Sequence, residues 1–264
     1  MIALCQNLET GYDDIGTGVP VVFVHGFPLN RSLWAPQAHG LVDRARCIAP
    51  DLRGFGESTV TPPYSMDQYA DDVVSLMDVL RLDRAVIVGL SMGGYVAMAM
   101  WRRHKARVRA LALVDTRAGA DSPEGRGKRD DMIALAKERG SAAVADAMIG
   151  SMVGEGTKSR APEVVESVHS MLSSAPVDGV IGALGALKQR PDSAATLATV
   201  DVPTLIVVGD EDALTPVAES QAMHQMIRGS SLETICGAGH LSNLERPAAF
   251  NHVMSEFLAT LTLA

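Results

Sequence analysis

The sequence predicts an α/β fold, with a mostly parallel, twisted sheet flanked by helices. Short apolar runs rich in β-branched residues alternate with helically periodic segments, and strands joined through helices run parallel and are covered on both faces. One of these runs stops at a serine set between glycines, a strand-to-helix turn that suits such a sheet. The expected strands are residues 19–24, 46–49, 85–88, 111–114, 204–208 and 232–235, and the expected helices are 31–42, 66–81, 92–104, 216–228 and 247–261.

Local signals support two further details of this fold. The helix over 66–81 begins at a capping box, Ser65-Met-Asp-Gln68, in which the serine hydroxyl accepts a backbone N–H of the first turn. Residues 1–18 carry a weaker strand pattern, and we expect an antiparallel hairpin that turns at Gly11-Tyr12. The parallel sheet would therefore have an antiparallel edge.

The alternation of strands and helices lapses between residues 118 and 200. This stretch is helical, with periodic segments at 132–139, 142–149, 163–172 and 177–188, and strand character returns only at Thr204. Helices inserted between two strands of one sheet predict a cap over the carboxyl edge, where ligands bind; a separate helical domain is the alternative. The predicted organisation is a core domain of residues 1–117 and 201–264 and a helical cap of residues 118–200, with residues 121–127 as the most flexible connection.

The composition is that of an ordinary soluble protein with ample core. Of the 264 residues, 47% are hydrophobic, and the net charge of −8 argues against nucleic acid and anionic membrane surfaces as partners. No apolar stretch approaches the ~18 residues of a membrane span, and the first thirty residues, without Lys or Arg, predict no secretory signal. Three distant cysteines fit neither a disulfide framework nor a zinc site, so we expect free thiols in the cytoplasm.

Residues 85–94, Ala-Val-Ile-Val-Gly-Leu-Ser-Met-Gly-Gly, are the most informative segment of the chain. The apolar run has the length of a buried parallel strand, and Gly89-Leu-Ser-Met-Gly93 fits the turn known as a nucleophile elbow. Side chains at the two glycine positions would collide with the neighbouring strand and helix, because the serine sits in a sharp, strained turn. The helix expected after the turn would point its partial positive charge at the site. Ser91 is therefore the candidate nucleophile.

A serine hydroxyl needs a general base, and that base needs a carboxylate to orient it. Both residue types follow later strands: the fifth expected strand ends in an acidic turn that contains Asp212, and the sixth ends in a Gly-rich loop with His240 at its tip. We expect Asp212 to orient His240. Asp210, nearer the end of the fifth strand, and Asp115, after the fourth strand, are the alternatives for the carboxylate.

Five segments form one ordered set along practically the whole chain. They are His25-Gly-Phe-Pro28, Asp51-Leu-Arg-Gly-Phe-Gly-Glu-Ser58, the elbow, Gly209-Asp-Glu-Asp212 and Gly237-Ala-Gly-His240. In their order and spacing the chain resembles the α/β-hydrolases, in the group of small serine esterases, 3-oxoadipate enol-lactonases and cofactor-free haloperoxidases (perhydrolases). The resemblance implies an α/β-hydrolase fold with a helical cap insertion, and a catalytic triad of Ser91, Asp212 and His240.

The same resemblance implies how the surrounding loops work. An oxyanion hole would consist of two backbone N–H groups, from Met92 after the nucleophile and from Phe27. His25 would brace the loop of Phe27 by hydrogen bonds, with a role as base as its alternative, and residues 51–58 would brace the loops rather than contact substrate. The remaining histidines are expected in helices, at the surface or in packing: His39, His104, His169, His224 and His252.

The predicted function is hydrolysis of carboxylic esters with short to medium acyl chains through an acyl-enzyme. A lactonase is the first alternative; its acidic substrate would call for a basic residue at the site, and Arg117, Arg160 and Arg190 are candidates that the sequence does not place. A perhydrolase, with peroxide in place of water, and a non-enzymatic receptor for a small ligand are the others. A serine nucleophile excludes the aspartate-nucleophile relatives, haloalkane dehalogenases and epoxide hydrolases.

No cofactor or metal is predicted, because the glycines lack dinucleotide or P-loop spacing and no His, Asp or Glu cluster has metal-ligand spacing. The expected partner is a small ester or lactone, neither nucleic acid nor membrane, and the sequence leaves monomer and homodimer open. The stretch 118–200 contains no Phe, Tyr or Trp but contains Met132, Met148, Met152 and Met171. Such a cap predicts an apolar, deformable acyl pocket.

Overall fold

An eight-stranded sheet forms the centre of the molecule in the computed structural model, which describes residues 1–262. The strand order is β1-β2-β4-β3-β5-β6-β7-β8, and neighbouring strands from β4 to β8 are parallel. The strands are β1 (Ile2–Cys5), β2 (Leu8–Ile15), β3 (Val19–Val24), β4 (Ala45–Pro50), β5 (Ala85–Leu90), β6 (Val108–Val114), β7 (Thr204–Gly209) and β8 (Ser231–Ile235). The predicted α/β class with a mostly parallel sheet is confirmed.

The antiparallel edge is present, but its turn lies elsewhere than the sequence predicts. β1 pairs with β2 through a two-residue turn at Gln6 and Asn7, whose φ angles of 49° and 67° are those of a hairpin turn with both central residues left-handed. Gly11 instead lies inside β2, and a Cβ there would come within 2.9 Å of the Asp51 carboxylate. The glycine therefore serves a close approach, which a sequence pattern does not distinguish from a turn.

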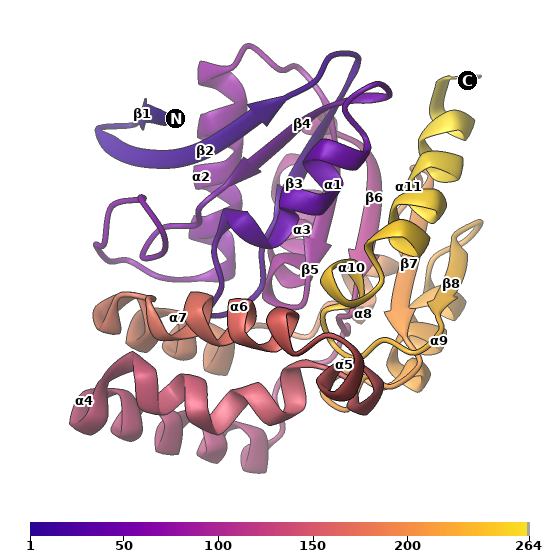
Figure 1. Cartoon of the computed structure of the whole chain (residues 1–264). Helices are drawn as coiled ribbons and strands as arrows, with labels where there is room; N and C mark the ends of the chain where they lie inside the picture. The colour runs from indigo at the N-terminus through magenta and orange to yellow at the C-terminus, as the bar shows by residue number, and fades with distance from the viewer. Residues whose placement is uncertain (263–264) are drawn as a thin grey trace.

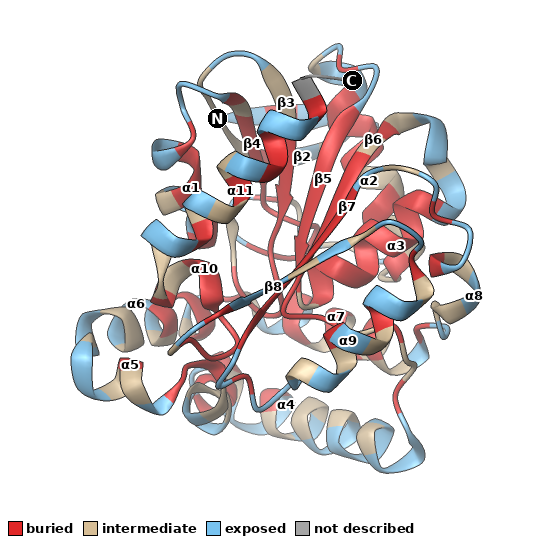
Figure 2. Cartoon of the chain, turned by 90° about the vertical axis from the view of Figure 1, so that its right-hand side faces the viewer, coloured by how far each residue is buried: buried red, intermediate tan, exposed pale blue. Residues whose placement is uncertain are grey.

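Helices cover both faces of the sheet, because side chains along each strand alternate between two apolar clusters. In β3, Val22 and Val24 join one cluster and Val21 and Phe23 join the other. The first cluster packs under α2 (Met66–Val79), α3 (Met92–His104) and α9 (Val217–Met226), and the second under η1 (Arg31–Trp34), α1 (Ala35–Gly40) and α11 (Pro247–Thr262). The central strands β5, β6 and β7 are buried along almost their whole length, whereas the edge strand β8 is largely exposed (Figure 2).

The stretch without strands forms helices beyond the carboxyl ends of the sheet, and the arrowhead of β7 points toward them (Figure 1). We name α4 to α7 the cap helices: α4 (Pro123–Met152), α5 (Glu155–Arg160), α6 (Pro162–Ser173) and α7 (Val177–Gln189). The two helices expected at 132–139 and 142–149 are the halves of α4, which breaks at Gly140 (φ 77°). The short helices η2 (Lys105–Arg107), α8 (Ala194–Leu197) and α10 (Ser242–Glu245) complete the fold.

The prediction of a flexible connection at residues 121–127 is wrong, because α4 already begins at Pro123. Ser122 caps the helix by accepting the N–H of Gly125 at 3.1 Å. A serine N-cap followed by proline in the first turn is a helix start signal. The capping box of α2 is confirmed in part, since Ser65 accepts the N–H of Gln68 at 3.0 Å.

None of the helices in residues 1–262, taken singly, has both the length and the apolar composition to cross a bilayer. Only α6 and α7 together have that length and composition, and this pair is bent by 93°.

Candidate active site

Ser91 occupies the sharp turn between β5 and α3. Its φ of 53° lies in the left-handed region, where a residue other than glycine is strained. A Cβ on Gly89 would overlap the carbonyl oxygen of Gly93, and a Cβ on Gly93 would overlap that of Val24 in the neighbouring strand. Both predicted collisions are thus confirmed, and they explain why small residues flank the serine.

Hydrogen bonds from the adjacent strand hold this turn in place. The Ser91 N–H donates to the Val114 carbonyl at 2.9 Å, and the Thr116 hydroxyl donates to the Ser91 carbonyl at 2.8 Å. α3 begins at Met92, so its N-terminus lies beside the serine and adds partial positive charge to the site. The strain at Ser91 is therefore supported on both sides of the turn.

The side chains of Ser91, His240 and Asp212 form one hydrogen-bonded chain. Ser91 Oγ lies 2.9 Å from His240 Nε2, and His240 Nδ1 lies 2.9 Å from Asp212 Oδ2. An ionised carboxylate can only accept, so Nδ1 carries the proton and Nε2 is left to accept the hydroxyl proton of the serine. These are the three residues that the sequence analysis selects, brought together from three loops.

The surroundings of these three side chains keep Asp212 ionised and His240 basic. Burial alone would raise the pKa of Asp212, but the His240 imidazole and the hydrogen bonds from Thr215 lower it below its usual value. Thr215 donates its hydroxyl to Oδ2 at 2.6 Å and its N–H to Oδ1 at 2.9 Å, and Leu214 N–H adds a third bond. Burial alone would lower the pKa of His240, but the Asp212 carboxylate outweighs burial and raises it.

The two alternative carboxylates bond elsewhere. Asp210 accepts the N–H groups of Gly237 at 2.7 Å and Ala238 at 3.3 Å, and so ties its own turn to the loop that carries His240. Asp115 is fully buried at the end of β6, and it accepts from Gly209 N–H and from Ser242. Only Asp212 among the three candidates makes a hydrogen bond to the His240 ring within the described residues.

Asp115 nevertheless affects the charge of the site. Burial, and next the negative charge of Asp212, raise the pKa of Asp115 to about 8. The two buried carboxyl groups therefore disfavour each other's ionisation, and Asp212, which is hydrogen-bonded to His240, is the one whose pKa is lowered. The Asp115 side chain joins the end of β7 to the segment after His240, which places it as a brace between two of the loops.

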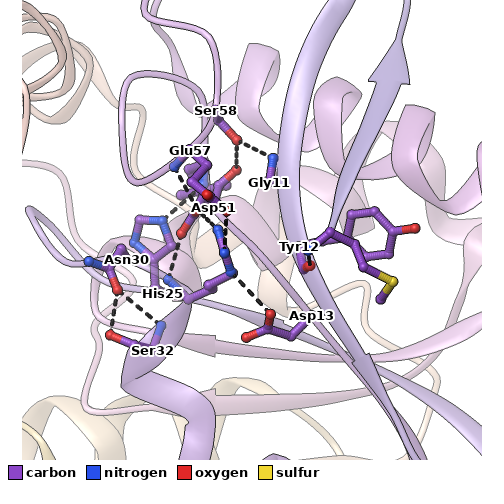
Figure 3. Close-up of polar contacts among 12 residues, drawn as sticks. Gly11, Tyr12, Asp13, His25, Asn30, Ser32, Asp51, Glu57 and Ser58 are labelled. Atoms are coloured by element: carbon purple, nitrogen blue, oxygen red, sulfur yellow. Dashed lines mark hydrogen bonds and ion pairs between the residues drawn. The ribbon is translucent and has the colours of Figure 1, made fainter.

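The loops on the other side of Ser91 are braced by a polar network (Figure 3). His25 donates Nδ1–H to the Gly26 carbonyl at 2.8 Å, and its Nε2 accepts the Leu52 N–H at 2.9 Å. Buried Asp51 accepts from the Arg31 side chain and N–H and from Glu57 N–H. Both nitrogens of His25 are thus used inside the loops, as expected for a brace, and residues 51–58 likewise bind protein groups.

Glu245 is a site residue that the sequence analysis missed. It is buried, and its carboxylate oxygen Oε1 accepts the N–H groups of both Gly239 and Leu241, the residues on either side of His240, while the other oxygen, Oε2, faces the cap. Oε2 accepts the Gly154 N–H at 2.9 Å and the Thr157 hydroxyl at 2.6 Å from the cap helices. Glu245 therefore links the loop of His240 to the cap, and no motif in the sequence points to such a link.

A cavity of about 470 Å³ opens above Ser91, between the sheet edge and the cap helices. Phe27 and Met92, the expected oxyanion residues, line it, and neither backbone N–H has a hydrogen-bond partner in the part of the chain that the structure describes. Met132, Met148 and Met152 also line it, whereas Met171 does not and instead contacts Ser32. The apolar wall includes Leu184, Leu187 and Leu214 as well.

Among the basic candidates, only Arg117 lines this cavity. Arg160 donates to the Gly237 carbonyl, and Arg190 is buried with its guanidinium 4.2 Å above the ring of Tyr95. Arg129, which the sequence analysis did not single out, also lines the cavity. No cluster of three or more His, Cys, Asp or Glu residues in positions 1–262 could hold a metal ion. The other five histidines lie in helices, as expected.

Comparison with known proteins agrees with this geometry. The family model for the alpha/beta hydrolase fold matches residues 19–247. The AB hydrolase superfamily protein YisY of Bacillus subtilis is 33% identical over 96% of each chain. A malate-bound thermophilic esterase from Thermogutta terrifontis is 40% identical, with a TM-score of 0.95 over 99% of this chain and 98% of that one. An enol-lactonase from Burkholderia xenovorans is 29% identical, with a TM-score of 0.91 over 98% and 100%. The chain belongs to the hydrolase family with the alpha/beta hydrolase fold.

Proposed function

We propose that the protein is a serine hydrolase of carboxylic esters. Ser91 is the nucleophile, His240 the general base and Asp212 the carboxylate that orients the base. The observation that carries this proposal is the hydrogen-bonded chain from Ser91 through His240 to Asp212, with both links at 2.9 Å, on the wall of a cavity large enough for a small ester.

The reaction has two halves. Ser91 Oγ attacks the ester carbonyl while His240 Nε2 takes its proton, and the N–H groups of Phe27 and Met92 stabilise the oxyanion. His240 then returns the proton to the leaving alcohol, which gives the acyl-enzyme. Water, deprotonated by His240, attacks the acyl group, and the acid leaves as Ser91 regains its proton. The raised pKa of His240 makes it a stronger base, and the ionised Asp212 stabilises the imidazolium.

Short to medium acyl chains fit this cavity best. Part of its wall is apolar and rich in methionine, with Met132, Met148 and Met152 from α4 and Leu184 and Leu187 from α7. A cavity of about 470 Å³ between the sheet edge and the cap helices has the size of a small-molecule pocket. We therefore expect acyl chains of about C2–C8 to be preferred, in line with the size of small-molecule pockets.

A series of p-nitrophenyl esters from acetate to palmitate tests this proposal. The expected result is a maximum of kcat/KM at or below C8, with no stimulation by emulsified lipid. A maximum at C12–C16, or activation at a lipid interface, would contradict the proposed preference for short to medium acyl chains. The series is read against Ser91→Ala protein prepared in the same way, which corrects for contaminating esterases.

A lactone hydrolase is the second candidate, and it uses the same three side chains. It is supported by the likeness to the Burkholderia enol-lactonase over 98% of this chain. The two candidates separate in one assay: slow turnover of every ester beside rapid turnover of an acidic enol-lactone would favour the lactonase. Rapid turnover of simple esters beside a slow lactone would favour the esterase.

We also infer that the protein acts in the cytoplasm, on a small-molecule substrate. Cys5 and Cys47 are buried free thiols, and Cys236 is an exposed one, which suits a reducing compartment. Thiol titration of freshly prepared, denatured protein should find three free thiols. A disulfide between any two of them, or between two chains through Cys236, would contradict this inference.

A further inference from the structure

One side of the cavity carries more positive charge than its neighbours neutralise. Buried Asp121 accepts from Arg117 and Arg190 at 2.8 Å and from Arg129 at 3.1 Å, so three guanidinium groups surround one carboxylate. Glu219 lies close enough to Arg117 to raise the pKa of its guanidinium together with nearer groups. Even with Glu219 included, three positive charges face two negative ones, in a protein whose net charge is −8.

The three arginines differ in how far they reach the cavity. The Arg190 side chain is 2% exposed and lies over Tyr95, whereas those of Arg117 and Arg129 are 29% and 28% exposed and line the cavity. Arg190 therefore holds Asp121 from the protein side. Arg117 and Arg129 present their guanidinium groups on the cavity side.

Arg129 has donors to spare. Its Nε–H donates to Asp121 Oδ2, and neither of its terminal nitrogens has a hydrogen-bond partner among residues 1–262. Asp121 thus fixes one edge of the guanidinium and leaves the terminal fork free. This planar fork matches the two oxygens of a carboxylate, which it can bind through two parallel hydrogen bonds.

The rest of α4 fits the same ligand. Ser122 and Gly125, at its N-terminus, line the cavity, where the positive end of the helix dipole favours an anion. Met132 follows Arg129 by one helical turn and also lines the cavity. One helix therefore presents a cationic end and an apolar wall to a cavity that contains Ser91. Lys128 adds little, because it is exposed and paired with Glu124.

We propose that Arg129 and Arg117 form a carboxylate-binding subsite, and that the substrate is an ester or lactone that carries a second, ionised carboxyl group. This inference rests on the proposed function of Ser91. It names the class of substrate: the apolar wall contacts the chain between the two groups, and the arginines bind the distal carboxylate. A neutral ester of the same length binds the apolar wall but leaves the fork unpaired.

Two matched pairs of esters test the subsite. Monomethyl adipate against methyl hexanoate places the extra carboxylate on the acyl side, and 3-acetoxypropanoate against propyl acetate places it on the alcohol side. In at least one pair we expect kcat/KM of the anionic ester to exceed that of the neutral one by about tenfold to a hundredfold, the range for hydrogen bonds to charged groups. The responsive pair shows on which side the arginines lie.

Variants assign the preference to Arg129. Arg129→Gln should bring the ratio of anionic to neutral kcat/KM close to one, and Arg129→Lys should keep part of it, since lysine retains the charge but loses the fork. Arg126→Gln is the matched control: the same substitution on the same helix, at an exposed residue outside the cavity. Its ratio should stay within about twofold of the wild type, as for exposed charges.

Two results would overturn the subsite. One is a wild-type protein that favours neither anionic ester, a comparison that needs no folded variant. The other is an Arg129→Gln ratio that falls no further than that of Arg126→Gln. If all four esters are hydrolysed without a preference for the anionic ones, the subsite is refuted and the proposed function stands. If none of the four esters is hydrolysed and Ser91 does not react, the proposed function itself is refuted.

Discussion

The carboxyl edge of the sheet and the cap helices are two walls of one cavity, and they are built in different ways. At the sheet edge, Ser91 sits in a strained turn, and Asp212 and His240 are fixed by buried hydrogen bonds. The cap contributes side chains from helices whose outer faces are exposed (Figure 2), and α4 breaks at Gly140. Substitutions at the edge would therefore break buried hydrogen bonds, whereas those on the cap helices change side chains that lie outside the sheet.

This difference separates two tasks. The edge determines which bond reacts, because the reacting atoms and their proton path lie there. We propose that the cap determines which molecule is held over that bond, through Met148 and its neighbours and through Arg129, which line the cavity. Changes at the edge should therefore abolish turnover of every substrate, whereas changes in the cap should redistribute turnover among substrates.

The largest effect is expected from Ser91→Ala. Removal of the hydroxyl removes the covalent route, and kcat should fall by about 10⁴-fold or more for every ester, as for other triad members. Circular dichroism and thermal unfolding check that the fold is kept. Turnover above a few per cent of wild type, in protein free of contaminating esterase, would place the nucleophile elsewhere.

The next largest effect separates two carboxylates within the edge. Asp212→Asn should lower kcat by at least about 10²-fold more than Asp210→Asn, because His240 then loses the anion that sets its tautomer. Asp210 instead accepts backbone N–H groups of the loop that carries His240. Steady-state kinetics on one p-nitrophenyl ester measures both. Equal losses would refute the assignment, and a harmless Asp212→Asn would move it to Asp115.

The pH dependence of the edge follows from the direction of the pKa shift. Protonated His240 cannot accept the serine proton, so kcat/KM should rise about tenfold per pH unit below the pKa of His240 and level off above it. Since Asp212 raises this pKa, the midpoint should lie above the ordinary value of about 6.5. Initial rates on a substrate without ionisable groups test this. A rate that falls with rising pH between 6 and 8, in folded protein, would contradict the role of His240.

The smallest effect is expected in the cap. Met148→Ala widens the cavity and should shift the preferred acyl chain to a longer one, with changes of about tenfold in relative kcat/KM, the value of one or two methylene groups. Met171→Ala is the matched control, because Met171 is a cap methionine outside the cavity. The ester series on both variants decides. An unchanged chain-length profile in Met148→Ala, or an equal shift in Met171→Ala, would contradict a role for the cavity methionines in selecting the acyl chain.

The edge was predictable from the sequence because backbone demands restrict residue types. Gly89 and Gly93 are needed where a side chain would overlap a carbonyl oxygen, and a strained turn between strand and helix fixes where Ser91 lies. Asp212 and His240 follow the ends of two other parallel strands, and the carboxyl ends of parallel strands lie at one edge of the sheet. The sequence therefore indicates that both residues lie near Ser91. The family resemblance favoured Asp212 over Asp210 although both lie in one acidic turn, and the hydrogen bond from the His240 ring to Asp212 agrees with that choice.

The cap and the braces were less predictable, because side-chain contacts leave no fixed spacing. Glu245 joins the loop of His240 to Gly154, 91 residues away in sequence, through hydrogen bonds alone. In the sequence Arg129 looks like an ordinary charged residue of a helix. Only the structure shows that Asp121 accepts its Nε–H and so fixes one edge of the guanidinium group. The hairpin turn was misplaced for a related reason, because Gly11 accommodates a neighbour rather than a turn.

The most direct test of the edge as the reacting wall is labelling with a fluorophosphonate, which reacts quickly only with an activated serine. Intact-mass and peptide mass spectrometry of the wild-type protein should show one adduct, on Ser91, formed at a rate that Met171→Ala, a substitution outside the cavity, leaves unchanged. Asp212→Asn should slow that rate strongly, and Ser91→Ala should remove the adduct. Ester hydrolysis that continues without an adduct, or an adduct on another serine, would contradict the assignment of Ser91 as the nucleophile.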